Sequence, residues 1–591
     1  MCGITGIYNF NKDKLDKKIL RNMTTILSHR GPDSEGYFID SGVGLGVRRL
    51  SIIDLSNNAN QPIYNENKNI VLVCNGEIYN YQILKKKLEE KGHSFYSNTD
   101  IEVIIHLYEE YGEKCTSYLR GMFAFAIWDS IRNVLFISRD RVGKKPLFYY
   151  LSKGVFLFSS ELKSLLCHPD FKKIIDYTSI GDYLTYGYVP LPKSIFKHTF
   201  KLEPGFYAVI SKKGMKRKRY WDIQFEDKYS NISFVKKEIR KLLTDSVNLR
   251  LQSDVPVGTF LSGGIDSSII TSLASKKINK LRTYCIGFKE KEYDESRYAE
   301  KMSKFLGTNH RTKIFEYKDL KKLPKILWYY NEPYFDYSML PSFLLSEFAS
   351  KNVKVVLNGD GGDENFAGYD RYVPFFKLNY KKMALFHLNR LINVKKLFYS
   401  FPKQVRDTKF IQRVSFNLGS LYNLPFEDYL NRLVIYQNKD KAALIKSQKI
   451  LNNNSYIKIK KYYYLNKNLN QLNRKLYSDF KTYLVDDLLV KMDIATMSNS
   501  IEARSPFLDN KFIDFTSKID SKLKIVGGNK KHILKETFKD HLPNSIIYRK
   551  KMGFGIPFDV WLRKDLSDEI YNVISKENSF VGSLINKKRV R

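Results

Sequence analysis

Hydrophobic positions follow two different patterns along the chain, and the change between them falls near residue 215. Before it, short apolar runs lie between turns rich in Gly, Asn and Asp, a pattern typical of strands. These runs are 70–74, 122–128, 134–138 and 155–159. Segments 81–91 and 101–111 instead mix apolar and polar residues at helical spacing. The first part is therefore predicted to be a strand-rich α+β domain.

After the basic stretch at 217–221, longer helical patterns alternate with short apolar strands at 257–261, 283–287 and 353–357. Strands that alternate with helices predict a doubly wound parallel sheet, with ligands bound at the carboxyl ends of its strands. The second part is therefore an α/β domain with extra helices. We predict a first domain at 2–215, a linker at 216–232 and a second domain at 233–591.

Composition narrows the class of protein. The 591 residues are 43% hydrophobic and 27% charged, which is typical of a globular protein with large cores. Five cysteines without a CxxC pair argue against a disulfide framework and a structural zinc site. No apolar run approaches the length of about 18–20 residues that spans a bilayer. We expect a cytoplasmic protein with no membrane partner.

The net charge of +37 raises the question of nucleic-acid binding. The lysines are spread along the chain, and only 212–219 and 458–461 are dense. Charge runs of this kind usually form solvated faces, so no nucleic-acid partner is expected. A basic nucleic-acid-binding protein with a vestigial catalytic core stays the alternative from another class, and it predicts salt-sensitive binding without glutaminase activity.

Residues 262–268 read SGGIDSS, between an apolar strand and an amphipathic helix. Glycines let backbone N–H groups approach an anion, and the helix start adds further donors and a positive dipole end. The loop has no lysine and its spacing is not GxxxxGK[ST], so it is not the loop that cradles a transferred γ-phosphate. The string resembles the pyrophosphate-binding motif of ATP pyrophosphatases. That resemblance implies that Asp266 helps to hold Mg²⁺ against the pyrophosphate.

A second turn, at 358–364, reads NGDGGDE after another apolar strand. Its carboxylates, Asp360, Asp363 and Glu364, are close enough in sequence to repel one another unless a cation pairs with them. Mg²⁺ or a substrate ammonium group would serve. An acidic solvent loop is the structural alternative, and the position at a strand end favours the ligand site.

Cys2 is the candidate nucleophile. Removal of Met1 would leave a thiol and a free α-amine on one residue, and the amine, with a pKa near 7.7–8.0, can take the thiol proton. Four segments accompany it: SHRGPD at 28–33, RLSIID at 49–54, CNGEIYN at 74–80 and NTD at 98–100. Together they resemble the glutamine amidotransferase domain with an amino-terminal nucleophile.

This resemblance implies an αββα fold in which Cys2 attacks the side-chain amide of glutamine. Asn75 and Gly76 would then donate to the oxyanion, although the pair could also form a simple turn. Arg49 would bind the glutamine carboxylate, and Glu77 and Asp100 its ammonium group. The residues implied in glutamine binding are Arg49, Ile53, Asn75, Gly76, Glu77 and Asp100.

The whole chain resembles the glutamine-hydrolysing asparagine synthetases, with further matching segments at 486–493, 500–509 and 549–555. The family implies glutamine, ATP and a carboxylate acceptor as substrates, with Mg²⁺ on Asp266 and Asp363. Lys551 would stabilise charge during adenylation. The ATP and pyrophosphate residues would be Leu261, Ser262, Gly263, Gly264, Asp266, Ser267, Ile286, Asn358 and Gly359. The acceptor pocket would contain Asp360, Asp363, Glu364 and Asp487.

The acidic turn departs from well-known asparagine synthetases, which carry Ser, Glu and Ser at positions 358, 360 and 362. This leaves two acceptors open. The first is L-aspartate, converted to asparagine through β-aspartyl-AMP with release of AMP and pyrophosphate. The second is another carboxylate, such as a uronic acid in surface polysaccharide synthesis, because adenylation needs only a carboxylate. An internal ammonia tunnel is expected from the family, and a homodimer is compatible with this interpretation.

Overall fold

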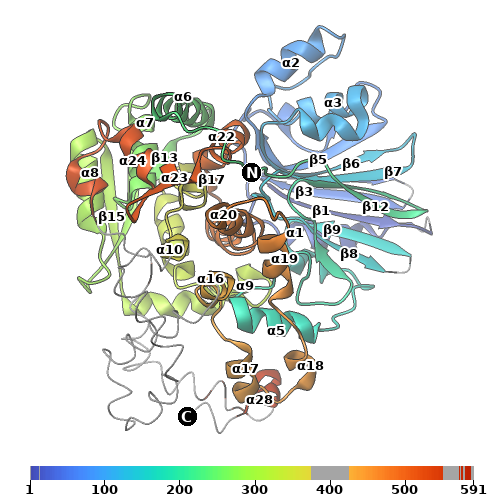
Figure 1. Cartoon of the computed structure of the whole chain (residues 1–591). Coiled ribbons are helices and arrows are strands. Elements are labelled where there is room, and N and C mark those ends of the chain that lie inside the picture. Colours follow the sequence, from blue (N-terminus) through green and yellow to red (C-terminus); the bar gives the residue numbers. More distant parts are fainter. Residues whose placement is uncertain are drawn as a thin grey trace.

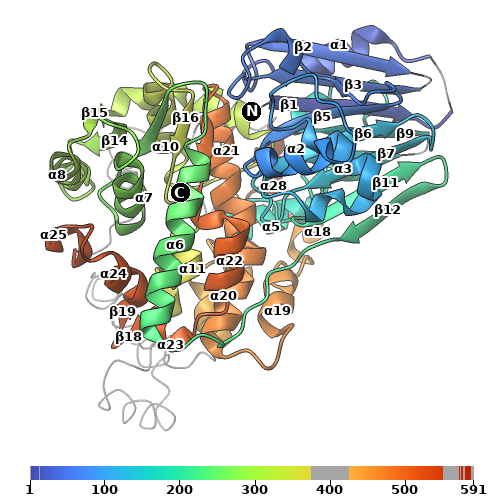
Figure 2. The same ribbon diagram turned by 90° about the horizontal axis from the view of Figure 1, so that it is seen from above.

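The structure is a computed structural model that describes residues 2–11, 14–40, 42–152, 154–373 and 425–549, together with residues 555, 572, 574, 576 and 579–586. Its amino-terminal part consists of two antiparallel sheets between layers of helices, and its carboxy-terminal part is built on a parallel sheet (Figure 1). The amino terminus lies between the two parts in Figures 1 and 2.

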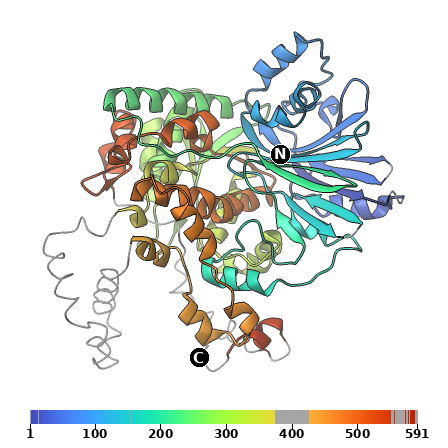
Figure 3. The ribbon, with the colours of Figure 1, turned by 45° about the vertical axis from the view of Figure 1, so that its right-hand side comes forward.

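Each antiparallel sheet has six strands, and the two sheets stack face to face (Figure 3). The first sheet has the order β10 (Thr199–Lys201), β8 (Phe148–Ser152), β9 (Val155–Ser159), β1 (Cys2–Asn9), β3 (Val43–Arg49) and β2 (Ser34–Asp40). The second has the order β12 (Gly214–Arg219), β11 (Phe206–Ser211), β7 (Val134–Arg139), β6 (Gly121–Asp129), β5 (Ile70–Ile78) and β4 (Ile63–Tyr64).

The two sheets and the helices outside them form four layers. The alternation of side chains along each strand explains this arrangement. Val71 and Val73 of β5 face the core between the sheets, while Leu72 and Cys74 face the outer helices. Successive side chains of a strand point to opposite faces, so one apolar run fills both layers. The outer helices are α2 (Tyr81–Glu89) and α3 (Val103–Tyr111) on the second sheet, and α1 (Lys17–Thr25), α4 (Leu162–Leu165) and α5 (Tyr177–Tyr186) on the first.

The parallel sheet has the order β15 (Asn309–Phe315), β14 (Arg282–Phe288), β13 (Val257–Phe260), β16 (Val355–Leu357) and β17 (Glu502–Arg504). Val355 and Leu357 pack in one hydrophobic cluster and Val356 in another, so this strand is buried on both faces. The first cluster joins α6 (Ile232–Arg250), α7 (Ile265–Ser275), α8 (Ser296–Leu306) and α24 (His532–Phe538). The second joins α9 (Leu323–Tyr330), α10 (Met339–Ala349) and α21 (Leu489–Met497).

The predicted fold class is confirmed, with an αββα part followed by a parallel α/β part with extra helices. Residue 215, the expected end of the first domain, lies inside β12, which pairs with β11 through Arg219. Residues 216–219, assigned to the linker, therefore belong to this sheet. The two-domain division itself stays a prediction. Within the described residues, no helix is both long and apolar enough to cross a membrane.

The two parts share a buried interface. Leu50 and Tyr79 of the amino-terminal part lie in the same hydrophobic cluster as Phe507 of the carboxy-terminal part. Asp493 of α21 accepts hydrogen bonds from Arg30 at 2.8 Å and from Lys145 at 3.1 Å. All three side chains are at most 4% exposed. Burial raises the pKa of Asp493, but the two cations outweigh it and hold the pKa below its usual range.

Asp493→Asn should lower the free energy of unfolding by about 3–5 kcal/mol at pH 7, because it leaves two buried cations without their counter-charge. Since the folded pKa is depressed, the stabilisation exists above the unfolded pKa of about 3.9 and is lost as pH falls through the folded pKa. Urea unfolding from pH 7 to pH 3 should therefore show the two proteins converging in acid. Glu300→Gln, in an exposed pair with Lys304, is the matched control and should change little. Equal effects of both substitutions on the free energy of unfolding would contradict the role of Asp493 as the buried counter-charge of the two cations.

Candidate active sites

Cys2 begins β1 and faces Arg49 of β3 across the sheet. It is 4% exposed, and its Sγ accepts a hydrogen bond from Gln61 Nε2 at 3.4 Å. Gln61 is fixed in turn by the backbone of Cys74, which donates to Oε1 at 2.6 Å and accepts from Nε2 at 3.0 Å. Sequence analysis missed Gln61, whose only signal is a Gln-Pro pair before a strand. The thiol is thus buried at the start of β1, in the hydrophobic cluster between the two sheets.

Asn75 lies beside the nucleophile on β5. The Cys2 backbone N–H donates to Asn75 Oδ1 at 3.2 Å, which turns the amide NH₂ toward the other side. That nitrogen, Nδ2, is buried and has no hydrogen-bond partner among the described residues. An unused buried donor next to a thiol is suited to a developing oxyanion. At the neighbouring Gly76, an added Cβ would lie 2.5 Å from the Met122 carbonyl oxygen, so no side chain fits there.

Arg49 is held by the loop that follows β3. Its guanidinium donates to Asn60 Oδ1 at 3.0 Å and to the carbonyl oxygens of Ile53 and Asp54. These contacts orient the arginine, and the predicted role of Arg49 and Ile53 in binding glutamine stays a prediction.

The two carboxylates predicted for the glutamine ammonium have different environments. Asp100 Oδ2 accepts from the Ile78 backbone N–H at 2.6 Å, and burial raises the pKa of Asp100 to about 6. Glu77 pairs at 3.0 Å with Arg504 of the carboxy-terminal part. Glu77 is therefore tied to the interface, and the predicted binding of the glutamine ammonium by Glu77 and Asp100 stays a prediction.

The SGGIDSS segment forms a tight loop between β13 and α7. Gly263 has φ +66°, and an added Cβ would lie 2.6 Å from the Tyr298 backbone. Ser262 Oγ accepts from the Gly264 N–H at 3.3 Å and lies 3.1 Å from Ser267 Oγ. The loop thus presents hydroxyls and backbone donors at the start of α7, an arrangement that binds anions.

The acidic turn packs directly against this loop. An added Cβ on Gly359 would lie 2.9 Å from Asp266 Cβ, and one on Gly362 would lie 2.5 Å from Asp266 Cγ. Only glycine permits so close an approach. The two turns predicted separately from the sequence therefore form one site at the carboxyl edge of the parallel sheet.

Lys531 joins these two turns. Its ammonium group pairs with Asp266 and, at 2.7 Å, with Asp363 Oδ1. Burial lowers the pKa of Lys531, but the two carboxylates outweigh it and raise the pKa above its ordinary value. Sequence analysis missed this residue, whose only signal is a Lys-Lys pair after Gly527 and Gly528. Lys551, assigned to charge stabilisation, lies outside the described residues.

The two turns line a cavity of about 880 Å³. The lining includes most of the predicted nucleotide and acceptor residues, namely Leu261, Ser262, Gly264, Asp266, Ser267, Ile286, Asn358, Gly359, Asp360, Asp363 and Glu364. Asp487 is not part of this lining. It accepts from the Tyr334 hydroxyl, and burial raises the pKa of Asp487 to about 7. The cavity also contains Asp336 and Lys491, which pair at 3.3 Å.

Asp266 and Asp363 fit a hard divalent cation in their donor type, because oxygen carboxylates are the ligands that Mg²⁺ prefers. Both carboxylates converge on a single positive group, the Lys531 ammonium. Their arrangement therefore suits positive charge, and Mg²⁺ on these residues stays a prediction.

The amino-terminal part is also hydrogen-bonded to the acidic turn that lines this cavity. Lys144 donates to Ser505 Oγ, which donates to Asn358 Oδ1 at 2.6 Å. Asn358 Nδ2 donates in turn to Asp360 Oδ2 at 2.7 Å. Burial lowers the pKa of Lys144 to about 7. A lysine of the first part is thus linked by three hydrogen bonds to the acidic turn of the second.

The family model for asparagine synthase matches residues 238–591, and that for a glutamine amidotransferase domain matches residues 1–221. This chain belongs to the asparagine synthase family. Its similarity to asparagine synthetase (glutamine-hydrolysing) 1 of Bacillus subtilis is 35% identity, over 98% of this chain and 90% of the relative. A putative asparagine synthetase (glutamine-hydrolysing) 2 of Methanocaldococcus jannaschii is 36% identical, over 84% and 98%.

A relative with a different name, amidase chry2 of Gibberella zeae, is 29% identical over 98% of this chain and 92% of its own length. Relatives that match nearly the full length of this chain therefore carry different names. The resemblance drawn from the sequence motifs, and the prediction that the chain is an enzyme of this family, are confirmed.

The pH dependence of glutamine use should report Asp100. Because the pKa of Asp100 is about 6, its carboxylate is ionised above pH 6 and protonated below it. The fall of kcat/KM for glutamine with decreasing pH should steepen below about pH 6. Asp100→Asn should remove this steepening and lower kcat/KM about 10–100-fold, the loss typical of one charged hydrogen bond. Steady-state glutaminase assays from pH 5 to pH 9 would check this. An unchanged profile in the variant would assign the ionisation to another group.

Proposed function

We propose that the protein makes L-asparagine from L-aspartate, ATP and glutamine. One observation carries this proposal: a part with a buried thiol beside an unpartnered amide donor is joined, through a buried interface, to a part with a cavity lined by an anion-binding loop. The names of the Bacillus subtilis and Methanocaldococcus jannaschii relatives support it.

In the amino-terminal part, removal of Met1 would free the Cys2 amine, which takes the thiol proton. The thiolate then attacks the side-chain amide carbon of glutamine, and Asn75 Nδ2 and the Gly76 N–H donate to the oxyanion. Ammonia leaves with the transferred proton, and water hydrolyses the thioester to glutamate. Loss of one oxyanion donor typically costs about 3–4 kcal/mol of transition-state stabilisation. The unpartnered amide of Asn75 supports this role.

In the carboxy-terminal part, the pyrophosphate end of ATP would bind the loop of Ser262 and Ser267, with Leu261 and Ile286 against the base. An oxygen of the aspartate β-carboxylate attacks the α-phosphorus, which gives β-aspartyl-AMP and releases pyrophosphate. Ammonia then attacks the acyl carbon and AMP leaves.

Lys531 is placed to neutralise charge on the departing pyrophosphate, since its ammonium already lies between Asp266 and Asp363. Bound at these carboxylates, Mg²⁺ would supply further positive charge against the phosphates.

Ammonia must pass between the parts without meeting bulk water. A small cavity of about 40 Å³ lies at the interface, lined by Arg30, Glu161 and Lys144 from one part and by Tyr330 and Asp493 from the other. A cavity needs about 10–15 Å³ to hold one water molecule, and ammonia is similar in size. This cavity can therefore hold ammonia. This supports the expected tunnel, whose continuity stays a prediction, as do the homodimer and the cytoplasmic location.

Two substitutions should separate the two reactions. Cys2→Ala should abolish glutamine-dependent synthesis and retain synthesis from ammonia, because only nitrogen delivery needs the thiol. Lys531→Met should lower synthesis from either nitrogen source at least about 100-fold and spare glutaminase, since about 3 kcal/mol of charge stabilisation is lost only at the second site. Assays of glutamate, AMP and asparagine on both variants check this. Parallel loss of all three products in either variant would contradict separate sites.

Charge in the cavity distinguishes the two candidate acceptors. Burial raises the pKa of Asp360 and raises that of Glu364 to about 7, so the cavity favours a ligand that brings positive charge. The aspartate α-ammonium would supply it, whereas a uronic acid would not. This favours aspartate. The similarity to amidase chry2 keeps another carboxylate as the second candidate.

A carboxylate screen would decide between these acceptors. With ammonia, ATP and Mg²⁺ present, pyrophosphate release should depend on L-aspartate and should be absent with glucuronate and galacturonate. L-Glutamate is a matched control with the same charges and one more methylene, and it should react at least about 10-fold more slowly. Release with a sugar acid but not with aspartate would favour the second candidate. Absence of AMP with every acid would contradict the adenylation chemistry itself.

A further inference from the structure

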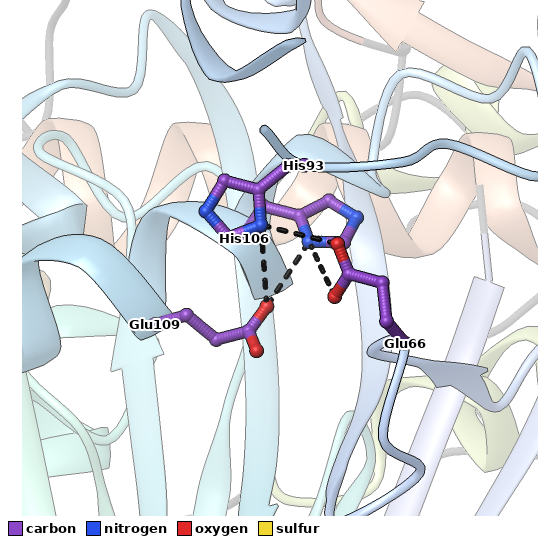
Figure 4. A group of neighbouring side chains, drawn as sticks. All are labelled: Glu66, His93, His106 and Glu109. Atoms are coloured by element: carbon purple, nitrogen blue, oxygen red, sulfur yellow. Dashed lines mark hydrogen bonds and ion pairs between the residues drawn. The ribbon is translucent and has the colours of Figure 1, made fainter. Parts of the chain in front are cut away.

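Among the described residues, one group of His and Glu side chains converges away from both sites (Figure 4). Glu66 lies in the turn between β4 and β5, His93 in the segment after α2, and His106 and Glu109 one turn apart on α3. One nitrogen or oxygen atom of each residue lies within 4.8 Å of the others. We propose that these four side chains form a binding site for one divalent transition metal ion, best matched by Zn²⁺.

The distances suit a tetrahedral ion. With bonds of about 2.0–2.1 Å, neighbouring ligand atoms of a tetrahedral zinc site lie about 3.3–3.4 Å apart. His93 Nδ1 lies 3.2 Å from Glu66 Oε1 and 3.8 Å from Glu109 Oε2. His106 Nδ1 lies 3.5 Å from Glu66 Oε2 and 3.0 Å from Glu109 Oε2. These four separations bracket the tetrahedral edge, although His93 and His106 lie nearest to different oxygens of Glu66. Small rotations of the side chains would place one atom of each residue around a single ion.

The chemistry of the donors favours zinc over the hard cations. Two imidazole nitrogens select Zn²⁺, Cu²⁺ or Ni²⁺, whereas Mg²⁺ and Ca²⁺ take oxygen ligands. The two carboxylates carry two negative charges, which one divalent ion would neutralise. The cysteine count predicts no structural zinc site, and this cluster uses no cysteine.

Both imidazoles have a second carboxylate near the ring nitrogen that points away from the centre. His106 Nε2 faces Glu102 Oε1 at 3.8 Å, and His93 Nε2 faces Glu110 Oε1 at 3.4 Å. Each ring thus directs Nδ1 to the centre and leaves Nε2 near a second carboxylate, where a small rotation would form the carboxylate–histidine–metal arrangement.

The carboxylate ligands are also held in place. Asn65 Nδ2 donates to Glu109 Oε1 at 2.8 Å, which leaves Oε2 directed at the centre. The Ser94 backbone N–H donates to Glu66 Oε1 at 3.1 Å.

The site is open to solvent on one side, and its position indicates what a bound ion would do. His106 is 1% exposed, while Glu66 is 34% exposed, so an ion can enter from the Glu66 side. His93 and His106 flank the segment that carries Asp100, and an ion that joins them would clamp the connection between α2 and α3 onto the turn before β5. The inferred role is structural support of this connection.

Metal analysis of the full-length protein tests the site. After treatment with EDTA, reconstitution with Zn²⁺ and gel filtration, elemental analysis should find one zinc per wild-type chain. The double variant Glu66→Gln and His93→Gln should bind zinc at least about 100-fold more weakly, a loss beyond that of an outer partner. Co²⁺ in place of zinc should give the visible absorption of a tetrahedral site in wild type and not in the double variant.

Matched controls keep the outcome decisive. His541→Gln removes a histidine outside the cluster and Cys2→Ala removes a reactive thiol, and both should retain the full zinc content. The test uses substitutions at His93 and Glu66, which are partly exposed. It avoids the buried His106, where a substitution is more disruptive to folding. Wild-type protein without stoichiometric zinc, or zinc retained equally by the double variant, would overturn the proposal and leave a set of ordinary ion pairs.

Discussion

The arrangement of this enzyme depends on buried charge between its two parts, above all at the carboxylate of Asp493. Two cations of the amino-terminal part, Arg30 and Lys145, donate to its two oxygens. Removing three charges from water is costly, and the cost is recovered only if the parts meet in one geometry. Arg30 also donates to the carbonyl oxygen of Cys2, at 3.3 Å. A residue that contacts the backbone of the nucleophile thus also joins the two parts.

At the second site, strain and charge are concentrated in one lysine. Lys531 adopts φ 55°, a left-handed conformation that typically costs a non-glycine residue about 1–3 kcal/mol. Its ion pairs with Asp266 and Asp363 offset this cost. Without the ammonium, two carboxylates on adjacent turns would repel each other. Electrostatic attraction thus keeps the two turns together before any substrate binds.

Chemistry that is contiguous in sequence was predictable. The chemistry of the SGGIDSS segment, of the acidic turn and of Cys2 can each be recognised within a few consecutive residues. The spacing of apolar residues predicted both types of sheet. Chemistry assembled across the chain was not. Lys531 pairs with a residue 265 positions earlier and Arg30 with one 463 positions later, and neither has a local signal. The pairing of Glu77 with Arg504, which lies in the other part of the chain, has no local signal either.

The hydrophobic cluster that contains Leu50, Tyr79 and Phe507 belongs to both parts of the chain. Residues that would lie on the surface of an isolated amidotransferase part are therefore in the core of the whole protein. The amino-terminal part cannot be exchanged for that of a distant relative as a self-contained module, since its inner face is complementary to one neighbour. Evolution of the two reactions is therefore constrained to proceed in step, with substitutions on either side of the contact accepted in pairs.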